Sequence, residues 1–140
     1  MINFMGTMLP KGRSTILIVD DDDDIRAEMR AVFEEEGYAV LEACDGMEAL
    51  DVLHWSGSEF ICALVLDLWM PRMSGWDFLG FLKNNETFSR IPVVIASALP
   101  VHGDASGIGA TMHWLRKPFG SRELLEAVRS CGEGSTRSTH

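Results

Sequence analysis

The chain has 140 residues, of which 46% are hydrophobic and 24% are charged, as expected for one globular domain of ordinary size. Its net charge of −9 at pH 7 argues against direct nucleic-acid binding, because phosphate contacts need clustered lysine and arginine. The sequence contains no apolar run of the roughly 18 residues that a membrane-spanning helix needs, so we expect no membrane insertion.

The two ends of the chain differ from its middle. Residues 1–13 lack the layout of a signal peptide, because Lys11 and Arg13 follow the apolar part instead of preceding it. We expect a flexible leader at 1–13, one domain at 14–131 and a flexible polar tail at 132–140. We expect no second domain, and therefore expect another protein to supply the output. The three cysteines lack metal-ligand spacing and favour reduced thiols in a cytoplasmic protein: Cys44, Cys62 and Cys131.

Strand and helix patterns alternate from residue 16 onwards. The unbroken apolar run at 16–20 predicts a strand that is buried on both faces. A helix is predicted next, with Asp22 or Asp23 as the cap and Gly37 closing the end. Residues 38–43 predict a second, weaker strand. The helix has apolar residues on one face, which we expect to point inward: Ile25, Met29, Val32 and Phe33.

The middle of the chain continues the alternation. Residues 47–55 predict a short helix, and 60–68, the longest apolar run, predict the central strand. Residues 76–82 predict a third helix after the turn signal Ser74-Gly75, and 93–97 predict a strand. The inward residues of the 47–55 helix are expected to be Met47, Leu50, Val52, Leu53 and Trp55.

The last third contains a segment that fits a helix badly. Residues 100–110 should hold a fourth helix, yet they contain a proline and several glycines. Each glycine inside a helix costs about 1 kcal/mol relative to alanine. We therefore expect a short, irregular or mobile helix there. Residues 113–116 predict the last strand, and Ser121 is expected to cap a final helix with Leu124, Leu125 and Val128 inward. Alternation of this kind predicts an α/β fold with right-handed crossovers and a parallel sheet covered on both faces.

Three of the predicted strands end in charged residues. The first ends in Asp20 and Asp21, the central one in Asp67, and the last in Lys117 before a proline. In an open parallel sheet, ligands bind outside the carboxyl ends of the strands, so we expect these side chains to form one site. Three carboxylates and an ammonium suit Mg²⁺, which prefers carboxylate and water oxygens, together with a phosphoryl group.

Each of these residues also has a simpler explanation. The acidic run 20–24 alone fits the solvated, capped start of a helix equally well, because the helix dipole favours acids there. Asp67 alone would more often be a cap, and Lys117 a surface lysine. Two carboxylates about 4 Å apart repel by roughly 4 kcal/mol at an effective dielectric constant of about 20. A cluster of three therefore needs a cation or raised pKa values. Asp67 could then accept a phosphoryl group as an acyl phosphate.

Two further residues lie at or near strand ends. Ser97 could donate its hydroxyl to a phosphoryl oxygen, although serine is common at strand ends. Trp114 is most simply a packed aromatic side chain. The bond between Lys117 and Pro118 has an accessible cis form, which could turn the chain and direct the ammonium inward.

Four segments closely resemble the receiver domain of two-component response regulators, the family that includes chemotaxis regulators. They are Ile16-Leu17-Ile18-Val19-Asp20-Asp21, Leu66-Asp67-Leu68-Trp69-Met70-Pro71-Arg72-Met73-Ser74-Gly75, Ser97-Ala98 and Lys117-Pro118-Phe119. The resemblance covers about residues 14–130. It implies a flavodoxin-like, doubly wound sheet of five parallel strands in the order 2-1-3-4-5, within three α/β/α layers.

The resemblance also implies roles for individual residues. Asp67 would be the phosphoacceptor, and Asp20, Asp21 and Asp67 would hold Mg²⁺ together with the backbone carbonyl of Trp69. Lys117 would pair with the phosphoryl group. Ser97 would be the switch hydroxyl, and Trp114 the switch aromatic residue. The interval between Ser97 and Lys117 is slightly shorter than is usual in the family, and the shortfall falls in the glycine-rich segment.

We expect a receiver that accepts a phosphoryl group on Asp67 from a histidine kinase or phosphotransfer protein, with Mg²⁺, and later loses it by hydrolysis. Phosphorylation would switch a surface that binds an unknown downstream protein. One alternative is an interaction module that keeps the fold without being phosphorylated. Another is a haloacid-dehalogenase-like phosphatase, but that family has a second aspartate where this chain has Trp69.

Overall fold

The structure, a computed structural model, describes residues 14–56, 61–70, 74–98 and 112–137, with side chains up to residue 130 except that of Met112. The leader expected at 1–13 and the irregular helix expected at 100–110 lie outside these residues.

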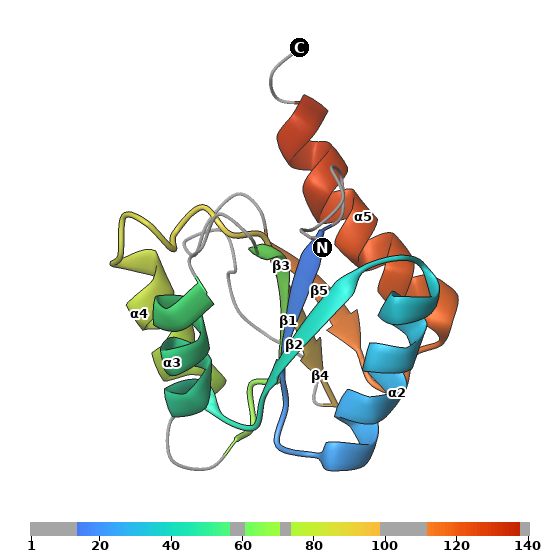
Figure 1. Cartoon of the computed structure of the whole chain (residues 1–140), viewed down its shortest axis with the longest axis horizontal. Coiled ribbons are helices and arrows are strands. Elements are labelled where there is room, and N and C mark those ends of the chain that lie inside the picture. The colour runs from blue at the N-terminus through green and yellow to red at the C-terminus, as the bar shows by residue number, and fades with distance from the viewer. Residues whose placement is uncertain (1–13, 57–60, 71–73, 99–111, 138–140) are drawn as a thin grey trace, which may run out of the picture.

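The described strands form one five-stranded sheet in the order β2-β1-β3-β4-β5, with every neighbouring pair parallel (Figure 1). This confirms the doubly wound order that the family resemblance implied. The strands begin and end close to the predicted positions. They are β1 (Thr15–Val19), β2 (Ala39–Ala43), β3 (Ile61–Leu66), β4 (Val93–Ser97) and β5 (Met112–Arg116).

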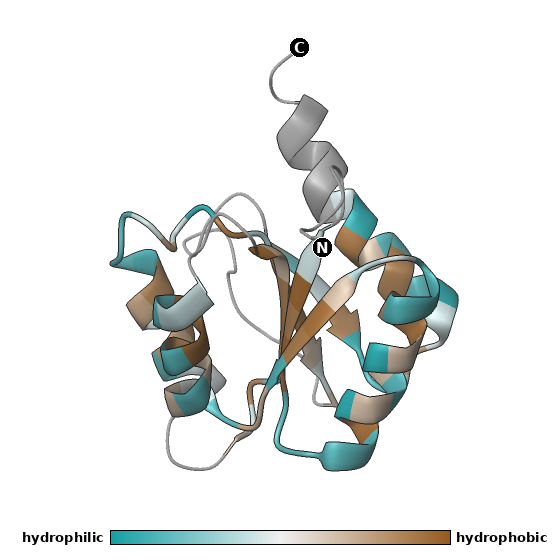
Figure 2. Cartoon of the chain, in the orientation of Figure 1, coloured by the Kyte–Doolittle hydropathy of each residue, from teal (hydrophilic) through white to brown (hydrophobic). Residues whose placement is uncertain are grey.

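Helices cover both faces of the sheet. α2 (Asp23–Glu35) and α5 (Ser121–Arg137) lie on one face, and α3 (Gly46–Ser56) and α4 (Gly75–Lys83) lie on the other (Figure 1). The period of two along a strand sends alternate side chains to the two faces. In β1, Ile18 packs with Phe33 on the α2 side, while Leu17 packs with Phe78 on the α4 side. Figure 2 shows hydrophobic strands between helices whose outer faces are hydrophilic.

The first helix begins and ends as the sequence predicted. The Asp22 carboxylate caps α2 by accepting hydrogen bonds from the backbone N–H groups of Asp24 and Ile25, at 2.9 and 3.2 Å. Gly37 follows the helix with a φ of 92°, a left-handed conformation that glycine adopts without steric cost.

The predicted inward face of α3 was partly wrong. Met47 is 47% exposed and Trp55 is 86% exposed, whereas Ala49 and Leu53 are fully buried. Ala49 and Leu53 are four residues apart and share one face of the helix. Met47 lies two residues before Ala49, and Trp55 lies two residues after Leu53. Two residues correspond to a rotation of about 200° around the helix axis, so both side chains point away from the sheet.

The predicted cap of α5 was also wrong. Ser121 is the first residue of the helix, and Gly120 occupies the position before it. The backbone N–H of Gly120 donates to the carboxylate of Glu123 at 2.9 Å, which is one half of a capping box. α5 continues to Arg137, past the expected start of the tail at 132. Among the described helices, none has both the length and the apolar character needed to span a membrane.

Candidate functional site

The carboxyl ends of β1 and β3 bring three carboxylates together. The backbone N–H of Asp67 donates to the carbonyl of Val19 at 2.9 Å, which holds the two strand ends side by side. One oxygen each from Asp20, Asp21 and Asp67 lies within 4.8 Å of the others. Asp20 is 1% exposed and Asp67 is 7% exposed, while Asp21 is exposed at the rim. The acidic residues that the sequence analysis selected therefore do meet, although their roles remain predictions.

Lys117 joins this cluster from the end of β5. Its ammonium lies 2.8 Å from Oδ2 of Asp20 and 3.6 Å from Oδ2 of Asp67. Its backbone N–H donates to the carbonyl of Ser97 at 2.8 Å, which fixes the start of the turn after β5. The peptide bond between Lys117 and Pro118 is cis. One ammonium thus contacts two of the three carboxylates.

Burial raises the pKa of Asp67 above its ordinary value, and the negative charges of Asp20 and Asp21 add to the rise. The backbone N–H of Trp69, which donates to Oδ1 of Asp67 at 3.2 Å, and the Lys117 ammonium oppose it. Burial and like charges prevail over these partners. Asp67 is therefore a carboxylate whose charged form would gain from additional positive charge.

The acidic cluster fits a bound Mg²⁺. Octahedral coordination at about 2.1 Å places adjacent ligand oxygens about 3 Å apart and opposite ones about 4.2 Å apart. Carboxylate oxygens within 4.8 Å of one another match this requirement after small side-chain adjustments. The backbone of Trp69 borders the site through its N–H group. The predicted ligand role of its carbonyl remains a prediction.

The acidic run after β1 serves two purposes. Asp20 points into the cluster, where its Oδ1 accepts a hydrogen bond from the backbone N–H of Asp22 at 2.9 Å. Asp22 caps α2, and Asp23 and Asp24 are exposed in its first turn. The helix-start explanation therefore holds for Asp22, Asp23 and Asp24, whereas Asp20 lies in the acidic cluster, whose metal-binding role remains a prediction.

Ser97 and Trp114 lie on the strands nearest Lys117. Ser97 ends β4 and is 2% exposed, beside Arg116 in the parallel register. Trp114 of β5 is half-buried, and its ring centroid lies 6.3 Å from that of Trp76 on α4, with 47° between the ring planes. A contact between Ser97 and a phosphoryl group, and a switching movement of Trp114, remain predictions.

Two residues near the site were missed by the sequence analysis. A Cβ atom on Gly75 would lie 2.6 Å from both the carbonyl oxygen of Asp67 and the Cα of Leu68. The sequence analysis treated Gly75 as a turn signal and as part of a family motif, without expecting its close approach to the backbone of Asp67. Arg26 donates through Nη1 to the backbone carbonyl of Asp20 at 2.6 Å. Nothing in the helical pattern of α2 distinguishes this arginine from Arg30.

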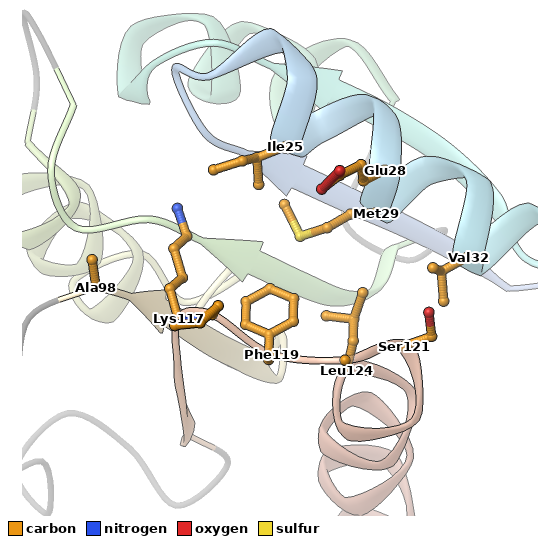
Figure 3. Close-up of a pocket in the computed structure, with 11 residues that line it drawn as sticks. Ile25, Glu28, Met29, Val32, Ala98, Lys117, Phe119, Ser121 and Leu124 are labelled. Atoms are coloured by element: carbon orange, nitrogen blue, oxygen red, sulfur yellow. The ribbon is translucent and has the colours of Figure 1, made fainter.

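A groove lies beside the site, between α2 and the start of α5 (Figure 3). Its volume is about 600 Å³, and Ala98 and Lys117 lie at one end. Its walls are mainly apolar, formed by Ile25, Met29, Val32, Phe119 and Leu124. Figure 3 shows the Lys117 ammonium extending beyond the apolar walls of the groove. The edge of the site thus offers a hydrophobic contact surface next to Lys117.

Comparisons with known proteins agree with this geometry. The family model of the response regulator receiver domain matches residues 16–129. The response regulator MprA of Mycobacterium avium is 37% identical over 117 residues, which are 82% of this chain and 49% of MprA. The transcriptional regulatory protein CpxR of Escherichia coli is 35% identical over 118 residues, which are 82% of this chain and 47% of CpxR. The chain thus spans about half the length of these curated relatives.

Solved structures have the same fold along almost their whole length. The chemotaxis protein CheY4 of Vibrio cholerae superposes with a TM-score of 0.77 at 26% identity, covering 86% of this chain and 99% of that one. A response regulator receiver domain protein from Clostridium thermocellum gives a TM-score of 0.74 at 27% identity, covering 88% and 97%.

Proposed function

This chain belongs to the receiver domain family of two-component response regulators, and from that premise we propose that Asp67 accepts a phosphoryl group from a histidine kinase or phosphotransfer protein. One observation carries the proposal. Asp67, at the end of β3, is a buried carboxylate within 3.6 Å of the Lys117 ammonium and beside two further carboxylates. Asp67 is the nucleophile in this arrangement, the Lys117 ammonium is a cation fixed beside it, and the carboxylates are possible ligands for a metal.

The transfer is a substitution at phosphorus. An oxygen of Asp67 forms a bond to the phosphorus atom as the bond from phosphorus to the donor's imidazole nitrogen breaks. The donor ring carries a proton on its other nitrogen, so the products are an acyl phosphate and a neutral imidazole. The Trp69 N–H holds Oδ1 and the Lys117 ammonium faces Oδ2, so the carboxylate is oriented before the donor arrives. Lys117 then balances part of the phosphoryl charge.

Asp20, Asp21 and Asp67 would hold Mg²⁺, which when bound supplies positive charge for the phosphoryl oxygens. The remaining contribution of the chain is to exclude water. Asp20 and Asp67 are almost fully buried, which strengthens their interactions with nearby cations. Hydrolysis of the acyl phosphate would return Asp67 to its free form.

We assign the signalling step to the β4–β5 side of the sheet. Ser97 and Trp114 lie on these strands, and Lys117 is hydrogen-bonded through its backbone to Ser97. A movement of Lys117 towards a phosphoryl group would be transmitted to this side and change a surface that binds a downstream protein. The proposal includes a cytoplasmic location. The free thiols of Cys44 and Cys62 support it, because disulfides are rare in the cytoplasm.

Intact-mass measurement after incubation with acetyl phosphate and Mg²⁺ tests the proposal. The wild type should gain the mass of one phosphoryl group, and Asp67→Asn should gain none. Asp51→Asn, which changes an exposed carboxylate on α3, should label like the wild type. Stoichiometric labelling of Asp67→Asn would overturn the assignment of Asp67. Absence of labelling in the folded wild type would favour the interaction module that is never phosphorylated.

A further inference from the structure

Arg26 connects the acidic site to the neighbouring strand. Its Nη1 donates to the backbone carbonyl of Asp20 at 2.6 Å, and its Nε donates to Oε1 of Glu42 on β2 at 3.0 Å. Its Nη2 donates to the carboxylate of Asp23 in the first turn of α2. The side chain is only 14% exposed although it is charged. A guanidinium with three partners in three segments is held in one conformation.

These contacts fix both peptide groups of Asp20. The backbone N–H of Asp20 donates to the carbonyl of Ala43 in β2 at 3.1 Å, and the carbonyl of Asp20 accepts from Arg26. Glu42, which anchors Arg26, precedes Ala43 in the same strand and pairs with Ile18 in the register of β1 and β2. The chain therefore leaves β1 in a direction set by β2, and this direction decides where the Asp20 carboxylate points.

The charge of Arg26 is already compensated by Glu42 and Asp23, so its effect on the site comes from orientation and not from net attraction. Arg30 provides a natural comparison one turn later. Among the described residues, Arg30 pairs with Glu42 and Glu34 and not with Asp20, and its side chain is 43% exposed. The two arginines share an anchor but differ in their contact with the site.

We propose that Arg26 is a positioning residue of the acidic site: anchored by Glu42, it holds the Asp20 carbonyl and so directs the Asp20 carboxylate towards the metal and Lys117. The inference rests on the proposed function, because it assumes that Asp20 is a metal ligand. Groups that orient the ligands of a metal typically change its affinity by about 10- to 100-fold. We expect a loss of that size when Arg26 no longer reaches Asp20.

Binding of Mn²⁺ alone, followed by the loss of the free-ion electron paramagnetic resonance signal, measures the effect without phosphorylation, since Mn²⁺ takes the same oxygen ligands as Mg²⁺. Arg26→Gln should weaken binding by about 10-fold or more. Arg26→Lys should weaken it similarly, because lysine keeps the charge but cannot hold three partners at once. Arg30→Gln should bind like the wild type.

Labelling with acetyl phosphate gives a second readout. The Arg26→Gln rate should be low at limiting Mg²⁺ and approach the wild-type rate at saturating Mg²⁺. Wild-type affinity in Arg26→Gln or Arg26→Lys, or an equal loss in Arg30→Gln, would overturn the inference. If Arg26→Gln does not fold, Glu42→Gln must weaken Mn²⁺ binding for the inference to stand. Failure of the wild type to bind Mn²⁺ would refute the metal site of the proposed function instead.

Discussion

Replacing Gly75 with alanine should damage both stability and the site. The new Cβ would lie 2.6 Å from the carbonyl oxygen of Asp67, 2.6 Å from the Cα of Leu68 and 3.1 Å from a methyl group of Leu68. The first two are backbone atoms at the end of β3, and Gly75 is tied to this backbone because its N–H donates to the carbonyl of Leu68 at 3.0 Å. A rotamer change cannot relieve the clash, so the backbone itself must move.

The expected magnitude follows from two opposing effects. Overpacking of this kind costs about 1–3 kcal/mol, whereas alanine is favoured over glycine inside a helix by up to about 1 kcal/mol. We expect Gly75→Ala to lower the free energy of unfolding by about 1–2 kcal/mol. That corresponds to a fall of roughly 4 °C in Tm for each kcal/mol in a domain of this size.

The same substitution five residues later in α4 is the matched control. Gly80 is exposed, and among the described residues nothing lies within 4 Å of a Cβ placed on it. Gly80→Ala should therefore raise the free energy of unfolding by about 0.5–1 kcal/mol. Denaturant unfolding of both variants gives the comparison, and acetyl phosphate labelling should be slowed only in Gly75→Ala. Equal stability of the two variants, with normal labelling, would refute the close approach at Asp67.

Two further predictions concern charge. Mg²⁺ at ten times its Kd should stabilise the wild type by about 1.4 kcal/mol, whereas Asp21→Ala should gain much less; an equal rise in Tm for both would count against this metal site. Burial alone would raise the pKa of Glu42, but hydrogen bonds from Arg30 and Arg26 hold it below its ordinary value. The stabilisation from Glu42, about 1 kcal/mol, is therefore complete above the ordinary glutamate pKa of about 4.3 and is lost as the pH falls through the lowered folded-state value. Glu42→Gln should be less stable than the wild type at neutral pH, and its stability should approach that of the wild type in acid. Urea unfolding at several pH values measures this; a difference in free energy of unfolding that stayed constant from pH 7 into acid would contradict the lowered pKa of Glu42.

Local sequence determined the elements of the fold. The unbroken apolar runs of β1 and β3 are long enough to identify buried parallel strands without knowledge of their partners. The cap at Asp22 and the left-handed glycine at Gly37 depend on contacts within a few residues, which a sequence pattern records directly. The strand order came from the resemblance to a family, carried by specific motifs around Asp67 and Lys117.

Only the tertiary structure decided how side chains from distant segments meet. Lys117 and Asp20 are 97 residues apart in the chain, yet their charged groups lie 2.8 Å apart because β1 and β5 end at the same edge of the sheet. The outward position of Trp55 follows from the rotation of α3 against the sheet, which its mixed apolar pattern left undetermined. The contact of Arg26 with the Asp20 carbonyl depends on Glu42 in β2, since helical spacing does not distinguish Arg26 from Arg30. Periodicity records which face of an element is buried, whereas the packing of whole elements decides which atoms meet.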